Sequence, residues 1–456
     1  MKQLFRIVLP LLIAVIGFNA CSTDKNETVI EHVKLAKNYD SKVIQQWQDL
    51  MLQVERYAAI YRPCPVARMS GYVGLAVYES AVAGMPEYQS LAPRFSGLAV
   101  PKVEDGKEYH WPTVVNNVYA TLYKKFFANV KASDLFKISA LESSLNAEFS
   151  GSINAEVYRR SQAYGISVAN AVWDFSATDK EGHDKYLDPR PTSYTPPSGA
   201  GKWVPTPPGL QGAMFPYWGK VRTFAIVDGE KICRPPLPYS EDKNSPYYAQ
   251  GLEIYSLTTP QSYENQWIAE FWSDDVLNFT FSPPARWLAV TNEVLAQEKS
   301  SLEIGILAAV KVGLALNDAA VGCWGSKFTY NIERPVTYIN RQINPNWNIT
   351  GLTSTGFLQS TPSFPAYPSG HATFSAAAAE ALSSVFGYNY SMTDRCHETR
   401  TEFNGKPRSF NSFYEMAQEN AFSRLVLGVH WRMDAEEGVR FGYQIGRKVN
   451  ALPFKK

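Results

Sequence analysis

Cysteine and histidine, from which most metal-binding motifs are built, are scarce in this sequence. Its 456 residues include 5 Cys and 6 His, and no Cys-x-x-Cys or Cys/His pair has the spacing of a metal site. This absence excludes the zinc-finger and zinc-ribbon classes. Widely spaced cysteines do not reveal their connectivity, so both disulfide pairing and buried free thiols stay open for Cys64, Cys233, Cys323 and Cys396.

The chain also lacks a large net charge of either sign. Its net charge is +1, with 19% charged and 45% hydrophobic residues, which is the composition of a globular protein rather than a disordered one. No global field favours nucleic acid or an anionic membrane surface, so we expect no nucleic-acid partner. If the protein binds an anion, a local cluster of cations must do so.

Beyond the N-terminus we find no run of 18 or more uncharged apolar residues, the length that a membrane span needs. Residues 1–21 have a basic start, an apolar stretch and Ala20 before Cys21, so they resemble a bacterial lipoprotein signal peptide. We expect lipidation of Cys21, a polar tether over 22–40, and an exported body held at a membrane only by this lipid, periplasmic or surface-exposed. An ordinary secretory signal is the alternative.

The remaining chain reads as all-α, with two packed helix bundles. Apolar residues recur at helical spacing from residue 41 to about 175. From about 186 to 245 a high density of prolines excludes long helices, while aromatic residues predict an ordered segment that wraps one face and forms an access wall. We therefore predict an N-terminal helical region over 41–245 and a C-terminal helical bundle over 246–456.

Lys327 and Arg334 form the first motif of interest. They are separated by seven positions, which is about two turns of an α-helix. We predict that both cations lie on one face of a helix that Pro335 ends. Two cations on one face are also typical of a solvated surface.

Ser369, Gly370 and His371 precede a run of alanines, which are strong helix formers. A helix beginning near Ser369 would present free backbone N–H groups and the positive end of its dipole, which is a ready anion site. Gly370 would let the backbone approach an oxyanion closely, with His371 aimed at the same point. The alternative is a plain helix cap beside an incidental histidine.

Arg424, His430 and Asp434 form the third motif. His430 and Asp434 are spaced four residues apart, so they share a face if that segment is helical. The carboxylate would hold one imidazole nitrogen and leave the other free, and Arg424 would add a planar donor. A surface His–Asp pair is the alternative.

Together the three motifs supply three cations, a hydroxyl, backbone donors and two histidines, as a tetrahedral or trigonal-bipyramidal oxyanion requires. Their order and spacing resemble the superfamily of type 2 phosphatidic acid phosphatases and vanadium-dependent haloperoxidases. The resemblance covers about residues 265–440, and the N-terminal half is included only by its helical content. It implies that the three motifs form one active site.

In the haloperoxidase branch, the resemblance implies a vanadate cofactor with His430 as the vanadium ligand. His371 would handle protons, Lys327 would polarise hydrogen peroxide, and a halide would be oxidised to hypohalous acid. Asp434 would stand behind His430. The resemblance also implies that Lys327, Arg334 and Arg424, with Ser369 and Gly370, bind the vanadate oxygens, and that His371 belongs to the cofactor-binding set.

In the phosphatase branch, His430 would attack a phosphate monoester and His371 would protonate the leaving alcohol. Lipid phosphatases of the superfamily are usually integral membrane proteins, and residues 365–374 and 427–434 resemble bacterial chloroperoxidase-like haloperoxidases. We therefore favour the haloperoxidase. An exported acid phosphatase is the alternative, and a catalytically inactive binding lipoprotein is a remote one, since no signature residue is missing.

Further positions follow from the same resemblance. Trp324 and Phe364 match apolar residues that line the halide side of the site in chloroperoxidase-like members. Asp275 matches an acid that pairs with the motif lysine, Lys327. The adjacent Asp274 is the other acid that could take this position. Iodide is the halide that is easiest to oxidise, so an iodoperoxidase is the specific expectation.

Overall fold

The computed structural model describes residues 34–207, 210–350 and 361–456. The predicted signal segment, including Cys21, lies outside these residues, as does most of the predicted tether. The end of that tether differs from the prediction: Ala36–Asn38 form a short 3-10 helix with Ala36 buried, and the Leu302 amide donates to the Tyr39 carbonyl. These residues pack on the body because Ala36 has an apolar surface to cover.

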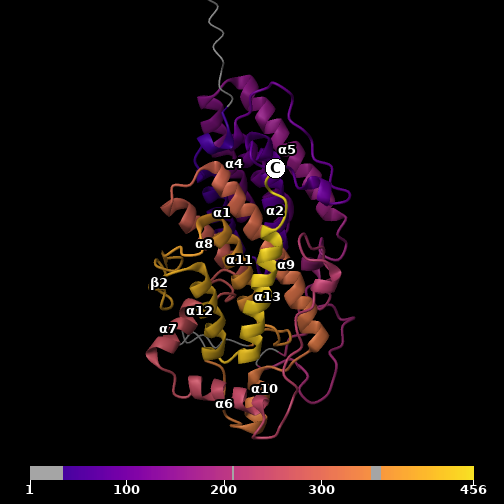
Figure 1. The fold of residues 1–456 in the computed structure, drawn as a ribbon, viewed down its shortest axis with the longest axis vertical. Helices are drawn as coiled ribbons and strands as arrows, with labels where there is room; N and C mark the ends of the chain where they lie inside the picture. The colour runs from indigo at the N-terminus through magenta and orange to yellow at the C-terminus, as the bar shows by residue number, and fades with distance from the viewer. Residues whose placement is uncertain (1–33, 208–209, 351–360) are drawn as a thin grey trace, which may run out of the picture. The chain divides into compact units, whose positions relative to one another are not determined.

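Helices dominate the described residues, which confirms the all-α prediction (Figure 1). The first half contains α1 (Lys42–Glu55), α2 (Cys64–Ala81), α3 (Trp111–Phe126), α4 (Ala132–Ser152) and α5 (Ala155–Ala177). The second half contains α6 (Pro246–Thr258), α7 (Tyr263–Phe271), α8 (Pro283–Gln297), α9 (Leu302–Tyr330), α10 (Pro335–Gln342), α11 (Gly370–Phe386), α12 (Phe413–Val426) and α13 (Arg432–Asn450). Strands β1 (Met392–Asp394) and β2 (Arg408–Phe410) pair antiparallel between α11 and α12.

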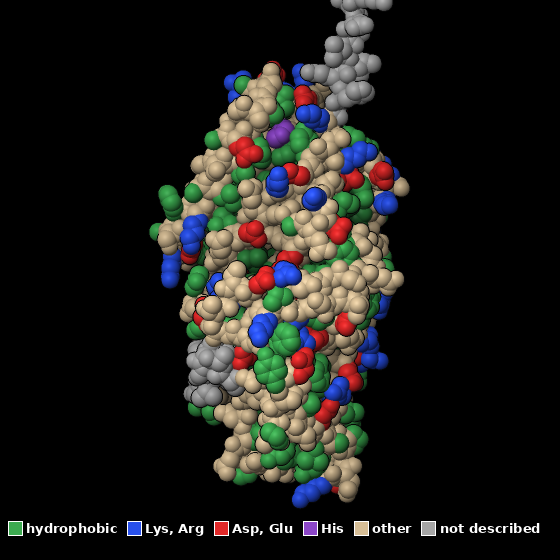
Figure 2. Space-filling view, turned by 90° about the vertical axis from the view of Figure 1, so that its left-hand side faces the viewer, with side chains coloured by type: hydrophobic (Ala, Val, Ile, Leu, Met, Phe, Trp, Pro, Cys, Tyr) green, Lys and Arg blue, Asp and Glu red, His purple; other side chains and the backbone are tan. Residues whose placement is uncertain are grey.

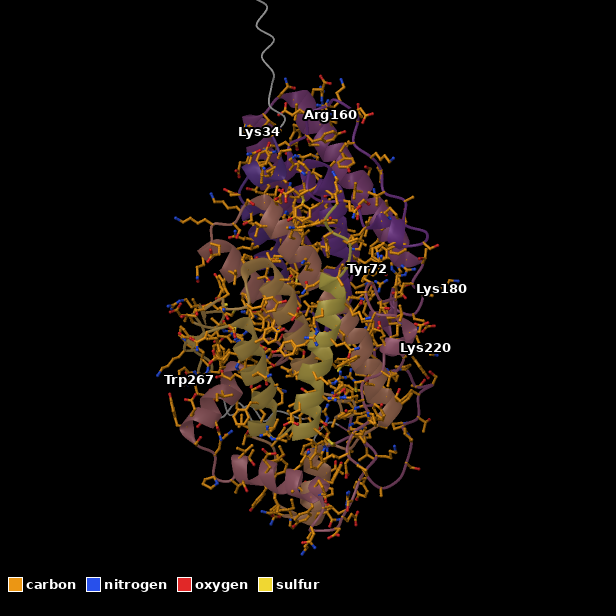
Figure 3. The ribbon with its side chains drawn as sticks, in the orientation of Figure 1. Lys34, Tyr72, Arg160, Lys180, Lys220 and Trp267 are labelled. Carbon is orange, nitrogen blue, oxygen red and sulfur yellow. The ribbon has the colours of Figure 1, made fainter. Side chains whose placement is uncertain are left out.

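Helix α9 is the central element. It packs along α2 from the first half and along α11 from the second, so the two expected bundles share this helix; the boundary predicted near residue 245 stays a prediction. Small residues allow the close approach: a Cβ at Gly313 would lie 2.2 Å from the Ser70 carbonyl oxygen, and one at Gly74 would lie 2.7 Å from that of Ala309. Tyr72, labelled in Figure 3, is buried in this α2 region.

The same helix is, by length and composition, apolar enough to cross a membrane, which the sequence reading missed. Its most apolar window has a mean hydropathy of 1.7, and 89% of that window is buried inside the protein. Burial among other helices is the property of a core helix. One such helix is therefore weak evidence for a membrane span.

Helices α11 and α13 lie side by side at the centre of Figure 1. Glycines of α13 again set the distance, since a Cβ at Gly442 would lie 2.4 Å from the Thr373 carbonyl oxygen. The chain end returns to the region after α2, where the Gln89 amide donates to the Phe454 carbonyl. This packing fixes the starts of α11 and α13 relative to each other.

The proline-rich segment between α5 and α6 is ordered where it is described, as predicted. It contains only short 3-10 helices (Lys185–Leu187, Trp218–Lys220 and Asp228–Glu230). Trp203, Phe215 and Trp218 are buried, so aromatic side chains rather than regular backbone hydrogen bonding hold the segment against the helices.

The described part of the structure contains four free thiols, at Cys64, Cys233, Cys323 and Cys396. Of the two possibilities left open by the sequence, disulfide pairing and free thiols, the structure shows free thiols. On the face shown in Figure 2, basic and acidic side chains are interspersed. That distribution agrees with the net charge of +1.

Candidate active site

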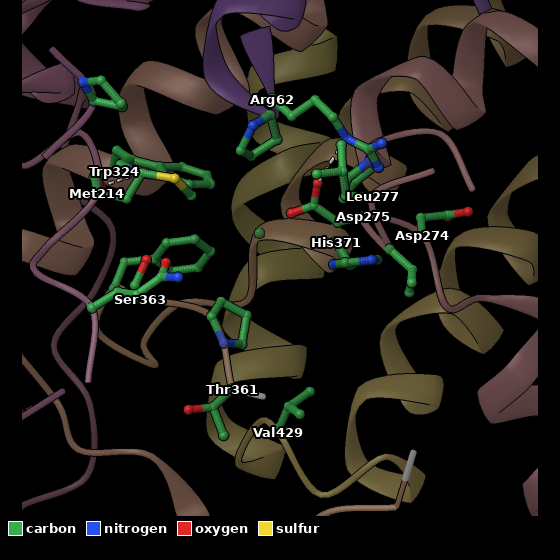
Figure 4. Close-up of a pocket in the computed structure, with 18 of the residues that line it drawn as sticks. Arg62, Met214, Asp274, Asp275, Leu277, Trp324, Thr361, Ser363, His371 and Val429 are labelled. Atoms are coloured by element: carbon green, nitrogen blue, oxygen red, sulfur yellow. Dashed lines mark hydrogen bonds and ion pairs between the residues drawn. The ribbon is translucent and has the colours of Figure 1, made fainter. Parts of the chain in front are cut away.

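A cavity of about 560 Å³ lies where the proline-rich segment meets the C-terminal helices (Figure 4). Predicted site residues from well-separated parts of the sequence line it: Asp275, Trp324, Phe364, Gly370, His371, Arg424 and His430. Pro189, Thr206 and Met214 complete one wall, so the proline-rich segment contributes to the cavity lining. Residues of the second and third motifs line the cavity, whereas Lys327 and Arg334 of the first motif are not among its lining residues. Arg334 lies behind the lining, against His430.

His430 and Asp434 make the predicted contact, but not from one helical face. Helix α13 begins at Arg432, so His430 precedes it and Asp434 lies in its first turn. The Asp434 Oδ2 atom accepts from His430 Nδ1 at 2.8 Å and from the Trp431 amide at 3.0 Å. The carboxylate thus caps the helix and holds the imidazole at the same time.

This arrangement fixes the tautomer of His430. Its Nε2 lies 3.2 Å from Nη1 of Arg334, and a guanidinium can only donate. Nε2 therefore carries a lone pair, and the ring proton is on Nδ1, facing Asp434. Burial, followed by the charges of Arg334 and Lys327, lowers the pKa of His430 well below its usual value, so the ring is neutral and its lone pair is available to a metal or a phosphorus centre.

Ser369 begins helix α11 as predicted. It is the N-cap residue, and its Oγ accepts from the Ala372 amide at 3.4 Å. The Ser369 amide donates to the Asp434 carbonyl, which ties the start of α11 to the start of α13. Gly370 lines the cavity, and a Cβ there would meet only the rings of Trp324 and Phe374, at 3.5 Å or more. The missing side chain leaves room for an anion beside the helix N-terminus.

His371 points into the cavity from the first turn of α11 (Figure 4). Its Nε2 atom is buried and has no hydrogen-bond partner. Burial, followed by the charge of Arg424, lowers the pKa of His371 well below its usual value. It is a neutral imidazole with one nitrogen available for proton transfer.

Two arginines approach the same point. Arg334 is fully buried; it donates to the carbonyl oxygens of Phe364 and Val429, and burial lowers its pKa to about 9. Arg424 lines the cavity, donates to the Trp272 carbonyl at 3.2 Å, and has an unpaired buried Nε; burial lowers its pKa to about 10. Both remain charged at neutral pH.

The segment from Lys327 to Pro335 is not the single helix that the sequence predicted. Helix α9 ends at Tyr330, where Asn331 adopts a left-handed conformation (φ 52°), and Pro335 begins α10 instead of ending a helix. Lys327 and Arg334 are therefore not on one helical face, although both reach the site. The Lys327 ammonium is fully buried and donates to three backbone carbonyls, those of Pro365, Ala366 and Pro368.

Burial, opposed mainly by Cys323, lowers the pKa of Lys327 to about 8. No carboxylate lies within ion-pair distance of Lys327, Arg334 or Arg424 among the described residues. Buried charges without a counter-ion are unfavourable. Carboxylates act on the three cations only from beyond ion-pair distance: Asp434 acts on Lys327 and Arg334, and Asp274 and Asp275 act on Arg424. A bound anion would supply the missing direct partner.

The expected pairing of Asp275 with Lys327 is wrong. Asp275 sits in a tight turn with φ 79°, and its Oδ1 lies 3.2 Å from Nε of Arg62. Its neighbour Asp274 is fully buried and faces Arg286 at 3.5 Å. Lys327 has no donor left for either carboxylate, because three carbonyl oxygens already accept from it.

Trp324 and Phe364 form an apolar wall of the cavity, and the halide-side role expected for them stays a prediction. Their ring centroids are 4.9 Å apart, and both residues line the cavity. The Lys327 ammonium lies 5.1 Å from the centre of the Phe364 ring, within cation–π range. The wall thus faces the cationic end of the site.

The sequence reading missed several wall residues. Arg62 precedes a proline outside every motif, yet it lines the cavity and donates to Asp275 there. Arg190 and Met214 lie in the proline-rich segment, for which the sequence predicted a wall but no individual residue. Irregular segments have no periodicity that would indicate which side chains turn inward.

The comparisons with known proteins agree with this geometry. A family profile described as the VCPO second helical-bundle domain matches residues 307–453. The vanadium chloroperoxidase of Curvularia inaequalis is 27% identical over 280 residues, which cover 48% of this chain and 46% of that protein. The vanadium-dependent bromoperoxidase of Ascophyllum nodosum is 31% identical over 119 residues, 24% of this chain and 21% of that protein.

Solved structures are similar over a greater length. A bacterial vanadium-dependent iodoperoxidase aligns with a TM-score of 0.78 and 28% identity, covering 91% of this chain and 96% of that one. A holo-type bacterial vanadium-dependent chloroperoxidase aligns with a TM-score of 0.63 and 16% identity, covering 86% of this chain and 92% of that one. At that identity the second likeness concerns the fold alone.

A helical fold with a buried cavity beside three buried cations defines the class. Within it, the chain is similar to the vanadium haloperoxidases, by the family profile over residues 307–453 and by its fold over most of its length. In sequence, it spans less than half the length of the two curated relatives.

Proposed function

We propose that this protein is a vanadium-dependent haloperoxidase, which uses hydrogen peroxide to oxidise a halide to hypohalous acid. The observation that supports this proposal is a group of three buried cations, Lys327, Arg334 and Arg424, with no carboxylate of the described residues at ion-pair distance. Arg334 lies 3.2 Å from the unprotonated Nε2 of His430, and the charges of all three lower the pKa of that histidine. That donor set fits vanadate, because a nitrogen lone pair can ligate the metal while cations neutralise its oxygens. The sequence and fold likenesses to vanadium-dependent peroxidases support the same reading.

His430 Nε2 would hold the vanadium, and Asp434 would keep that nitrogen unprotonated. Arg334, Arg424 and Lys327 would neutralise the oxygens, with the Ser369 hydroxyl and the Gly370 amide as further donors. When bound, vanadate supplies a Lewis-acidic centre that makes hydrogen peroxide susceptible to attack by a halide.

The other residues of the chain move protons and shape the cavity. His371 accepts or returns a proton at Nε2, which is free in the structure. The cations keep negative charge at the base of the cavity. Lys327, which already donates to three carbonyls, acts as a fixed charge there unless one of those bonds is exchanged.

We propose iodide as the halide. Iodide is the easiest halide to oxidise and the least strongly hydrated, so an apolar wall such as Trp324 and Phe364 suits it. The likeness to a bacterial iodoperoxidase, at 28% identity, supports this choice.

The decisive experiment compares two reactions of one purified protein. It is loaded with orthovanadate and assayed for peroxide-dependent iodide, bromide and chloride oxidation; without vanadate it is assayed for p-nitrophenyl phosphate hydrolysis. We expect vanadate-dependent iodide oxidation and little hydrolysis. Fast hydrolysis without halide oxidation would instead identify a phosphatase that acts through His430, and neither reaction would indicate an inactive binding protein.

Two substitutions separate binding from chemistry. Arg424→Ala removes a cavity cation, so it should weaken vanadate binding and abolish turnover. His371→Ala should abolish turnover while vanadate still binds, because the cations remain. Full activity in either variant would mean that the cavity is not the active site.

We also propose that the protein is exported and lipidated at Cys21, on the strength of the N-terminal sequence pattern. Mass spectrometry of the mature N-terminus from membrane fractions tests this. A Cys21→Ala variant that remains membrane-bound and carries the same N-terminal mass as the wild type would contradict it.

A further inference from the structure

Met214 lies on the cavity wall beside Trp324 (Figure 4). Its backbone is held at both ends: its amide donates to the Ser363 carbonyl at 2.8 Å, and its carbonyl accepts from the indole Nε1 of Trp324 at 3.3 Å. The next residue, Phe215, is buried and donates to the Pro189 carbonyl. The thioether is therefore kept at the wall.

Trp324 connects this thioether to the oxyanion end of the site. One end of its indole bonds to Met214, and the other end lies 3.5 Å from the position of a Cβ on Gly370. One aromatic ring thus spans the distance from the start of α11 to Met214. An oxidant formed near Gly370 would meet Met214 along this wall.

Met214 also differs from the other methionines in exposure. It is half-buried, whereas Met51, Met69, Met85, Met392, Met416 and Met433 are all buried. Among the methionines that the structure describes, it alone lines the cavity. A thioether is readily oxidised to a sulfoxide, and accessibility decides which one reacts.

We propose that Met214 is a self-modification site, oxidised to methionine sulfoxide by hypohalous acid before that product leaves the cavity. This inference rests on the proposed haloperoxidase function. The sulfur attacks the halogen of hypohalous acid, the halogen–oxygen bond breaks, and hydroxide leaves. Water then adds to sulfur as halide departs. Overall, thioether and hypohalous acid give sulfoxide, halide and one proton; sulfur loses two electrons and the halogen gains them.

The modification changes the wall. A sulfoxide is polar and chiral where the thioether was apolar, and it would lie next to Trp324, which forms the apolar wall with Phe364. Activity therefore falls as Met214 is oxidised, so this residue limits the number of turnovers that each molecule completes.

The test follows oxidation during turnover in the presence of excess N-acetylmethionine, which destroys oxidant that reaches bulk solution. Vanadate-loaded protein receives peroxide and iodide, and tryptic peptides are weighed for the gain of one oxygen. We expect Met214 to be oxidised about tenfold or more beyond every other methionine. Peroxide without iodide, and added hypoiodous acid with the same scavenger, should leave Met214 unmodified.

A pair of variants tests the consequence. Met214→Leu should lose less activity per turnover than the wild type. Met392→Leu changes a buried methionine of β1, so its activity should decline at the wild-type rate. Methionine sulfoxide reductase should restore the activity of spent wild-type protein.

The outcomes distinguish this inference from the proposed function. Iodide oxidation with unmodified Met214, or equal decline in Met214→Leu and the wild type, overturns the self-modification alone. Absence of any halide oxidation overturns the proposed function and the self-modification together. Oxidation of Met214 by added oxidant despite the scavenger would mean that surface accessibility, and not formation in the cavity, selects it.

Discussion

Asp434 Oδ2 accepts a hydrogen bond of 2.8 Å from Nδ1 of His430. Asp434 lies in the first turn of α13, whereas His430 precedes that helix. One carboxylate thereby caps α13, fixes the imidazole tautomer and leaves Nε2 unprotonated. Burial raises the pKa of Asp434 to about 7. The pair therefore joins the stability of a helix terminus to the electronic state of the proposed metal ligand.

Replacing Asp434 with Asn tests that relationship. The amide can donate to Nδ1, which would move the ring proton to Nε2 and remove the lone pair. We expect vanadate affinity to fall by about 10–100-fold, the usual effect of losing the partner of a ligating histidine. Calorimetric titration with orthovanadate measures it, and nitrogen NMR of His430 reports the tautomer.

Glu436→Gln is the control for this variant, since Glu436 is exposed on the same helix. It should bind vanadate like the wild type. Unchanged affinity in Asp434→Asn, with the proton still on Nδ1, would show that the carboxylate does not control the ligand.

Gly370→Ala should separate binding from stability. A Cβ at Gly370 meets no atom closer than 3.5 Å, and alanine is the better helix former, so the melting temperature should stay equal or rise slightly. The same methyl group would occupy the space beside the helix N-terminus, so oxyanion affinity should fall by at least about tenfold, or roughly 1.4 kcal/mol.

Gly151→Ala is the matched control, because its Cβ meets nothing within 4 Å and it lies in α4, outside the cavity lining. A Gly370→Ala protein that binds orthovanadate normally would show that no anion approaches this amide.

Arg286→Leu should destabilise the protein strongly. The guanidinium is fully buried; it donates to Asp394 at 2.8 Å and lies over the rings of Phe271 and Trp272. Removing it leaves buried Asp394 and Asp274 without their cation, which costs about 3–5 kcal/mol. Urea denaturation measures the loss.

A double variant, Arg286→Leu with Asp394→Asn, should recover part of that free energy, because the stranded charge is removed. If the single variant is as stable as the wild type, the buried ion pair contributes nothing.

Glu293→Gln should change how stability depends on pH. Burial, followed by the nearby Asp394, raises the pKa of Glu293 from 4.5 to about 7. The folded state therefore binds this proton more tightly than the unfolded state, and the resulting stability is complete below about pH 4.5 and is lost as pH rises through about 7.

Glutamine does not titrate, so the melting temperature of Glu293→Gln relative to the wild type should rise between about pH 5 and pH 8. The exposed Glu298→Gln serves as the control. A difference that stays constant over this range would mean that Glu293 ionises normally in the folded protein.

Local signals predicted some contacts correctly and the path of the chain less well. Ser369 was predicted to begin a helix because capping and alanine content act within a few residues, and α11 begins at Gly370. The prediction of one helix from Lys327 to Arg334 was wrong, because Asn331 adopts a left-handed conformation and ends α9. The spacing of apolar residues does not indicate such a helix end. Asp275 was assigned to Lys327 by resemblance, yet Arg62, distant in sequence, is its partner.

The sequence by itself determined the all-α class and the start of α11 beside Ser369, because residue type and spacing carry that information. It also proposed a set of oxyanion-binding residues from their spacing, and an apolar wall from a family resemblance. Only the tertiary structure decided that the cations lack carboxylate partners, that Arg334 donates to Nε2 of His430, and that Met214 joins the wall. Those facts depend on how α9, α11, α13 and the proline-rich segment pack together. Packing joins residues far apart in the chain, so no local pattern contains it.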